Sequence, residues 1–177
     1  MKIIAFVGMP ASGKSEASMV ARDFGINVIN MGDVIREEVE KRGLDPTDEN
    51  VGQVANDLRE REGMHAVAQR CVPNIKKVSS DVVVVDGVRG IAEVEYFKKE
   101  FGDDFKLISI NAPPQFRFER IRMRGRSDDM SDFNDLIRRD TRELGWGMGQ
   151  AMEDADVVVD NTSTLEEFKD NIERILR

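Results

Sequence analysis

Residues 3–15 read Ile-Ile-Ala-Phe-Val-Gly-Met-Pro-Ala-Ser-Gly-Lys-Ser, and this stretch decides the fold. Its first five residues are an apolar run rich in strand formers, which predicts a buried strand. The phosphate-binding loop pattern G-x-x-x-x-G-K-[ST] matches the next eight residues, which are Gly8, Met9, Pro10, Ala11, Ser12, Gly13, Lys14 and Ser15. A helix is expected to begin where the loop ends.

The chemistry of this loop explains its residue types. Glycines let the backbone curl so that its N–H groups point inward and hold phosphate oxygens. The positive end of the following helix favours the same anion. We expect Lys14 to reach the β- and γ-phosphates of ATP and the Ser15 hydroxyl to bind Mg²⁺. The alternative is a glycine-rich turn that carries a surface lysine.

Length and composition limit the possible domain number, binding partners and cellular location of the protein. A length of 177 residues predicts one domain, residues 1–177. The net charge of −8 argues against a general nucleic-acid or membrane binder. One cysteine and one histidine exclude an internal disulfide and a cysteine- or histidine-based zinc site. No apolar stretch approaches the ~20 residues of a membrane span, and no signal peptide is evident, so we expect a cytoplasmic protein.

Strand and helix patterns alternate along the rest of the chain. The four valines at 82–85 are typical of a strand buried on both faces, and further strands are expected at 26–29, 105–110 and 156–160. Helices are expected after residue 33 and at 49–62, 64–77, 91–101, 112–123, 131–144 and from Thr164, with 145–149 as a flexible stretch. This order predicts an α/β fold with a five-stranded parallel sheet flanked by helices.

Two aspartates follow expected strands and are candidate site residues. Ligands of such sheets bind at the carboxyl ends of the strands, so the loop, Asp33 and Asp86 would share one crevice. Asp86 is a candidate Mg²⁺ carboxylate, or a turn former before Gly87. Asp33 could orient or deprotonate a hydroxyl acceptor, or cap the helix that follows it.

Arginines are concentrated in the segment 117–142. Arginine neutralises the charge that spreads over a transferring phosphoryl group. The glycine break at 125 suggests a short lid, residues 124–137, that closes over the nucleotide. For any single arginine of this segment, the alternative is a position on a solvent-exposed helix face. The arginines expected to close on the transferred group are Arg120, Arg124, Arg126, Arg138 and Arg139.

Three stretches resemble known kinases. Gly32-Asp33-Val34-Ile35-Arg36 resembles the Gly-Asp-x-[Leu/Met]-Arg of adenylate kinases, whose arginine grips the acceptor's phosphate. Asp86-Gly87-Val88-Arg89 resembles their Asp-Gly-Phe-Pro-Arg, with the arginine one residue early and no proline. Residues 155–161, Ala-Asp-Val-Val-Val-Asp-Asn, are similar to dephospho-coenzyme A kinases. The resemblance implies that Asp33, Arg36 and Arg89 hold the acceptor.

Taken together, the chain resembles an archaeal family related to adenylate and dephospho-coenzyme A kinases, within the P-loop nucleoside-monophosphate kinases. The resemblance implies a three-layer nucleotide-kinase fold with residues 31–62 as the acceptor-binding lobe. It also implies transfer of the γ-phosphate of ATP to a small nucleotide or nucleotide-like acceptor. Two alternatives stay open: a hydroxyl kinase of the dephospho-coenzyme A type with Asp33 as base, and a nucleotide switch or slow ATPase read by a partner protein.

Overall fold

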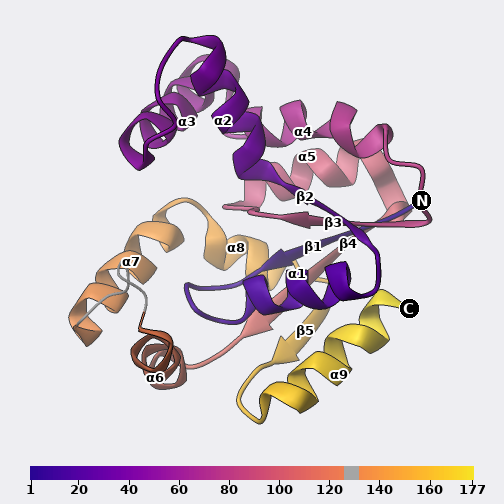
Figure 1. Cartoon of the computed structure of the whole chain (residues 1–177), viewed down its shortest axis with the longest axis vertical. Helices are drawn as coiled ribbons and strands as arrows, with labels where there is room; N and C mark the ends of the chain where they lie inside the picture. Colours follow the sequence, from indigo (N-terminus) through magenta and orange to yellow (C-terminus); the bar gives the residue numbers. More distant parts are fainter. Residues whose placement is uncertain (126–131) are drawn as a thin grey trace.

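The computed structural model describes residues 1–125 and 132–177 and contains a five-stranded parallel sheet in the order β2-β3-β1-β4-β5 (Figure 1). All five expected strands are present, with ends shifted by no more than one or two residues. They are β1 (Lys2–Val7), β2 (Asn27–Asn30), β3 (Val82–Asp86), β4 (Phe105–Asn111) and β5 (Val157–Asp160). The predicted α/β class is therefore confirmed.

Helices cover both faces of the sheet. They are α1 (Lys14–Asp23), α2 (Met31–Lys41), α3 (Asp48–Glu62), α4 (Ala66–Lys76), α5 (Ile91–Phe101), α6 (Pro114–Arg124), α7 (Phe133–Gly145), α8 (Met148–Glu153) and α9 (Leu165–Leu176), with a 3-10 turn at Gly102–Asp104. No helix in residues 1–125 or 132–177 is long and apolar enough to cross a membrane.

The core divides into two layers because side chains alternate along each strand. On one face, Ile3, Ala5 and Val7 of β1 pack with residues of α4, α5 and α8. On the other face, Ile4 and Phe6 pack with residues of α1 and α9. The valines of β3 at 83–85 are fully buried, as the run predicts for a strand covered on both sides.

The strand order indicates where on the sheet a ligand binds. After β1 the chain runs outward to the edge strand β2 and returns to β3, and it then crosses to β4 on the other side of β1. The direction of winding therefore reverses between β1 and β3, which is where ligands bind in such sheets. Ala5 pairs with Val85, so the phosphate loop and the residues after β3 begin side by side.

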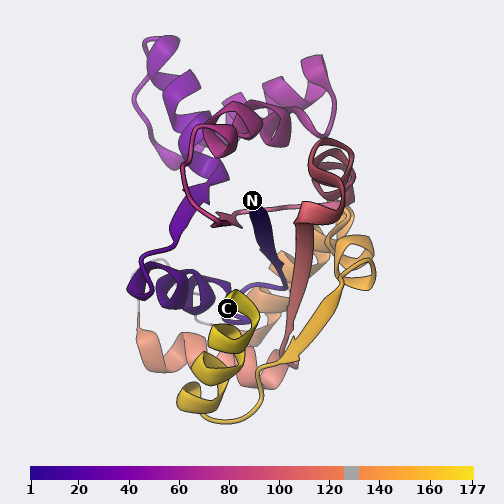
Figure 2. The same ribbon diagram turned by 90° about the vertical axis from the view of Figure 1, so that its right-hand side faces the viewer.

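Two groups of helices flank this edge. In Figure 1, α2 and α3 stand at the upper left and α6 and α7 at the lower left, with the loop before α1 between them. Both chain termini lie at the opposite end of the molecule, the end that faces the viewer in Figure 2. The carboxyl ends of the strands thus lie between two helical lobes.

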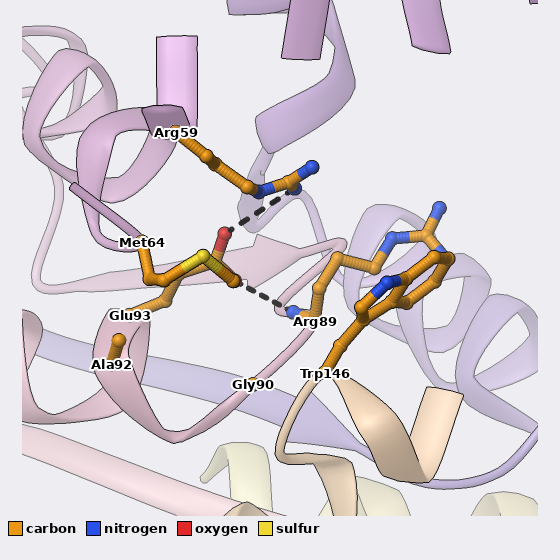
Figure 3. Close-up of a pocket in the computed structure, with 7 residues that line it drawn as sticks. All are labelled: Arg59, Met64, Arg89, Gly90, Ala92, Glu93 and Trp146. Atoms are coloured by element: carbon orange, nitrogen blue, oxygen red, sulfur yellow. Dashed lines mark hydrogen bonds and ion pairs between the residues drawn. The ribbon is translucent and has the colours of Figure 1, made fainter. Parts of the chain in front are cut away.

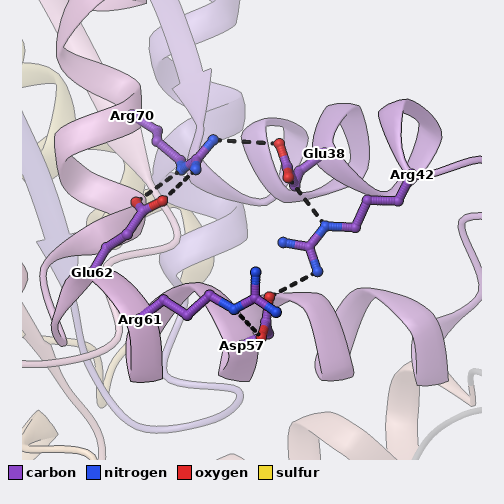
Figure 4. Close-up of polar contacts among 6 residues, drawn as sticks. All are labelled: Glu38, Arg42, Asp57, Arg61, Glu62 and Arg70. Carbon is purple, nitrogen blue, oxygen red and sulfur yellow. Dashed lines mark hydrogen bonds and ion pairs between the residues drawn. The ribbon is translucent and has the colours of Figure 1, made fainter.

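One lobe is tied together by charged side chains. Glu38 of α2 and Asp57 of α3 each hold two arginines, and these contacts link α2, α3 and α4 (Figure 4). The Arg42 guanidinium lowers the pKa of the Asp57 carboxyl from its usual range. The ion pairs are Arg42–Glu38 at 3.1 Å, Arg42–Asp57 at 2.8 Å, Arg61–Asp57 at 2.8 Å, Arg70–Glu38 at 3.4 Å and Arg70–Glu62 at 2.6 Å.

The expectation of a flexible stretch at 145–149 was wrong for its second half. Residue Gly147 adopts φ = 90°, which turns the chain between α7 and α8. Helix α8 then buries Met148 and Ala151 completely or nearly so against the core. Tertiary packing stabilises this six-residue helix, although its glycine-rich start carries no helical signal.

Candidate active site

The loop between β1 and α1 has the tight geometry that a phosphate site needs. A Cβ on Gly8 would lie 2.5 Å from the Ile110 carbonyl oxygen, so this position needs glycine. Gly13 has φ = 121°, and Ala11, with φ = 60°, is the only non-glycine residue of positive φ in the described segments. Backbone conformations of this kind are sparsely populated and cluster at ligand sites.

The polar groups of the loop fit a polyphosphate. Helix α1 begins at Lys14 with Gly13 as its cap and no side chain satisfying its first N–H groups, so these groups are available to an anion. The Lys14 ammonium lies inside the loop, where Nζ donates to the carbonyl oxygens of Gly8 and Met9. Ser15 is exposed in the first turn. The donors expected for ATP phosphates therefore converge in one loop.

Charges from three elements surround Lys14. Burial lowers the pKa of Lys14 from its usual range to about 8. The carboxylates of Glu143 and Asp86 oppose this shift, and the guanidinium groups of Arg89 and Arg139 reinforce it. A group with a strongly perturbed pKa inside a cleft is typical of a functional site.

These residues border a cleft with about 1360 Å³ of empty space, its open mouth included. It extends from the phosphate loop past the end of β3 to α2 and α3 on one side and α7 on the other. The expected site residues that line it are Pro10, Ala11, Lys14, Ser15, Arg36, Asp86, Arg89, Arg124 and Arg139. Gly8, Met9, Ser12 and Gly13 complete the loop next to this cleft.

The remaining expected residues lie elsewhere. Asp33 is largely exposed and pairs with Arg36 at 2.7 Å, and the cap of α2 is Asn30, whose side chain accepts from the Gly32 N–H at 2.8 Å. The Arg120 guanidinium donates to the Asn161 carbonyl. Exposed Arg138 pairs with Asp135. Neither Asp33, Arg120 nor Arg138 lines the cleft, and Arg126 falls outside the described residues.

A divalent cation would find few protein ligands here. Asp86 and Ser15 both line the cleft, and no group of three or more histidine, cysteine or acidic side chains forms a metal cluster in the described part of the chain. This fits Mg²⁺, which keeps several waters and is held by one or two protein groups together with phosphate oxygens.

A buried ion pair that the sequence did not identify ties the loop to two helices. Arg117 of α6 is 3% exposed, and its two terminal nitrogens donate to the Asp140 carboxylate of α7 at 2.8 and 2.6 Å. The same guanidinium donates to the carbonyls of Ala112 at 2.9 Å and Pro10 at 3.2 Å. It thus fixes α6 and α7 relative to the phosphate loop.

A second missed residue is Glu143, also on α7. Its side chain is almost fully buried, and Oε1 lies 3.6 Å from both Arg89 Nη1 and Arg139 Nε. The spacing of Leu136, Asp140 and Glu143 places all three on the buried face of α7. That spacing is the one sequence signal that could have indicated inward-facing acids.

The Asp-Asn end of the 155–161 motif also has a structural role. Asn161 is buried, and its Nδ2 donates to the Ser12 carbonyl of the phosphate loop at 2.8 Å. A Cβ on Gly13 would lie 2.5 Å from this nitrogen. The loop after β5 therefore supports the phosphate loop from behind, which explains the need for glycine at position 13.

Comparison with known proteins agrees with this architecture. A family model described as an AAA domain matches residues 7–136. A UPF0200 protein of Methanosarcina mazei is 61% identical over 176 residues, which cover 99% of this chain and 94% of that protein. Among solved structures, TT1252 from Thermus thermophilus superposes with a TM-score of 0.69 at 16% identity, covering 99% of this chain and 96% of that one.

A shikimate kinase from Bacteroides thetaiotaomicron superposes with a TM-score of 0.66 at 14% identity, covering 99% of this chain and 98% of that one. Identities this low show the shared fold alone. The expectation of an archaeal P-loop family is confirmed by the M. mazei relative and the AAA-domain match. The chain therefore belongs to the P-loop family described by that AAA-domain model and, within it, to the archaeal UPF0200 proteins.

Proposed function

We propose that this protein is an ATP- and Mg²⁺-dependent kinase that transfers the γ-phosphate of ATP to a small nucleotide or nucleotide-like acceptor. The observation that carries the proposal is the charge of the cleft. Six cationic side chains and three carboxylates line it, although the whole chain carries −8. Arg36 and Arg89 lie beyond the phosphate loop, on the side of α2 and β3, as an anionic acceptor requires.

In this proposal the parts of the cleft have separate tasks. The loop amides and Lys14 hold the β- and γ-phosphates. Ser15 and Asp86 would hold Mg²⁺, which neutralises charge on the phosphates when bound. Arg36, with Asp33 beside it in the acceptor-binding lobe of residues 31–62, binds the acceptor together with Arg89.

Arginines of α6 and α7 complete the site around the transferred group. Arg124 and Arg139 already line the cleft. Arg124 and Arg126 would belong to the lid at 124–137, and Arg139 follows it on α7. Arg120 and Arg138 would reach the phosphoryl group only after leaving their present contacts with the Asn161 carbonyl and the Asp135 carboxylate. Catalysis then consists of positioning and charge neutralisation, without a covalent enzyme intermediate.

The test is ATP consumption with Mg²⁺ over a panel of AMP, other nucleoside monophosphates, deoxynucleotides, dephospho-coenzyme A and no acceptor, with Lys14→Ala as the blank. We expect one class of acceptor to stimulate turnover strongly. Arg139→Ala should lower kcat, whereas Arg122→Ala, an exposed arginine of α6, should not. Stimulation by dephospho-coenzyme A alone would favour the hydroxyl kinase. A slow rate that no acceptor changes would overturn the kinase and favour the nucleotide switch.

A further inference from the structure

One buried acid of the main cleft has no role in the function proposed above. Glu143 of α7 lines the cleft, yet it is only 3% exposed. Its charge opposes the fall in the pKa of Lys14 more strongly than that of Asp86 does, so the carboxylate acts on the phosphate loop. Burying a carboxylate is unfavourable unless charged or polar groups compensate it. The groups that face Glu143 therefore indicate its role.

Two acids on the buried face of α7 hold their arginines in different ways. The Asp140 carboxylate accepts two short hydrogen bonds from buried Arg117, at 2.8 and 2.6 Å. Glu143 Oε1 instead lies 3.6 Å from both Arg89 Nη1 and Arg139 Nε, which is beyond hydrogen-bond distance. Glu143 thus attracts both guanidinium groups by charge, and these contacts leave their N–H donors to a ligand.

The two arginines that face Glu143 are fixed at the backbone and open at the guanidinium end. Arg89 follows β3, and its backbone N–H donates to Glu93 Oε2 at 2.6 Å (Figure 3). Arg139 is part of helix α7. The exposed fractions of the two side chains are 49% and 41%, and both side chains line the cleft. Glu143 is therefore the acid that brings the two guanidinium groups together.

This arrangement has a cost that the acid offsets. Two guanidinium groups beside the Lys14 ammonium repel one another, and half-exposed arginine side chains lose rotamer entropy when they are fixed. A carboxylate at the same distance from both groups counteracts this repulsion. In the proposed function Arg89 binds the acceptor and Arg139 the transferred group, so the separation of these two groups affects the alignment of the reaction.

We propose that Glu143 is a positioning residue that holds Arg89 and Arg139 together so that both bind the phosphoryl group during transfer. The proposal rests on the kinase function above. Glu143 itself does not bind the phosphoryl group, because a carboxylate only accepts hydrogen bonds and repels an anion. It acts through the two arginines, and misplacing such groups by about 1 Å can lower a rate about a hundredfold.

Side-chain motion tests the positioning without turnover. The measurement is NMR relaxation of the arginine Nε–Hε groups in the free protein. In the wild type, Arg89 and Arg139 should move less than Arg122, an exposed arginine of α6. Glu143→Gln keeps the size of the side chain but removes its charge, so both arginines should become about as mobile as Arg122. Glu119→Gln, which changes an exposed acid of α6, is the matched control and should leave both unchanged.

Kinetics test whether this positioning serves the transfer. With an acceptor that supports turnover, Glu143→Gln should lower kcat about ten- to hundredfold without raising the KM for ATP, because Lys14 and the loop amides still hold the phosphates. Combined with Arg139→Ala, it should lose less than the product of the two single losses, because Glu143 acts through that arginine. An acid with a merely structural role would multiply the two losses.

Three results would overturn the proposal. The first is that Arg89 and Arg139 are as mobile as Arg122 in the wild type. The second is that Glu143→Gln leaves their motion unchanged, and the third is that it frees them without lowering kcat. Turnover that no acceptor stimulates would overturn the kinase function instead, and the NMR result would still support or overturn the positioning of the two arginines.

Discussion

The buried pair between Arg117 and Asp140 gives the sharpest prediction for stability. Arg117→Met removes the guanidinium but keeps most of the side-chain volume, and it leaves the Asp140 carboxylate, 7% exposed, without its two hydrogen bonds. Removing one partner of a buried ion pair typically costs about 3–5 kcal/mol. We expect the free energy of unfolding to fall by about 4 kcal/mol, a large part of the about 5–15 kcal/mol typical of a whole protein.

The assay is urea denaturation of four proteins: the wild type, Arg117→Met, Asp140→Leu and the double variant. Replacing a buried pair by apolar side chains is often neutral, so the double variant should regain most of the stability that either single variant loses. Arg138→Met, which breaks only an exposed pair with Asp135 on the same helix, should change almost nothing.

Two results would refute this reasoning. If Arg117→Met lost less than about 1 kcal/mol, the carboxylate would have found water or another partner, and the pair would not be the link between α6 and α7. A double variant no more stable than the worse single variant would mean that the loss comes from packing or from the bonds to the Pro10 and Ala112 carbonyls.

Three further predictions concern ligand binding, packing and the thiol. Phosphates favour the charged form of Lys14, and its pKa in the protein without ATP is about 8. Raising the pH from 7 to 9 should therefore weaken ATP binding about tenfold. Calorimetry would check this, and an affinity that does not change with pH would contradict it. Gly90→Ala places a Cβ 2.1 Å from the Trp146 carbonyl oxygen, so thermal unfolding should show that the free energy of unfolding falls by about 1–3 kcal/mol. The control Gly52→Ala, in open space on α3, should show no such fall. Burial raises the pKa of Cys71 to about 12, so a thiol reagent at pH 8 should label it only on unfolding, and rapid labelling of the native protein would disprove its burial.

Local signals explain why most of the fold could be predicted. The apolar run at 3–7 and the four valines at 82–85 define central strands without reference to the rest of the chain. The phosphate loop fixes the start of α1, and Thr164 caps α9 by accepting from the Glu167 N–H, as expected. Handedness and alternation then restrict the topology to few choices.

The direction of polar side chains could not be predicted in the same way. Helix α6 carries arginines at 117, 120, 122 and 124, yet one is buried, one contacts the Asn161 carbonyl, one is exposed and one lines the cleft. The difference depends on Asp140, which lies 23 residues beyond Arg117 on another helix. The burial of Glu93 is likewise decided by tertiary contacts, which include Arg59 of α3.

The cationic groups of the cleft already have partners within the protein. The Lys14 ammonium is bound by the carbonyls of Gly8 and Met9, and Glu143 lies between Arg89 and Arg139. The free protein thus supplies carbonyl oxygens to Lys14 and one counter-ion, Glu143, to the two arginines, and an incoming anion must compete with these partners. A monovalent anion such as chloride replaces only one, whereas a polyphosphate chain replaces them together. Added potassium chloride should weaken ATP binding by screening the half-exposed arginines, but the cleft should still favour multiply charged ligands over chloride.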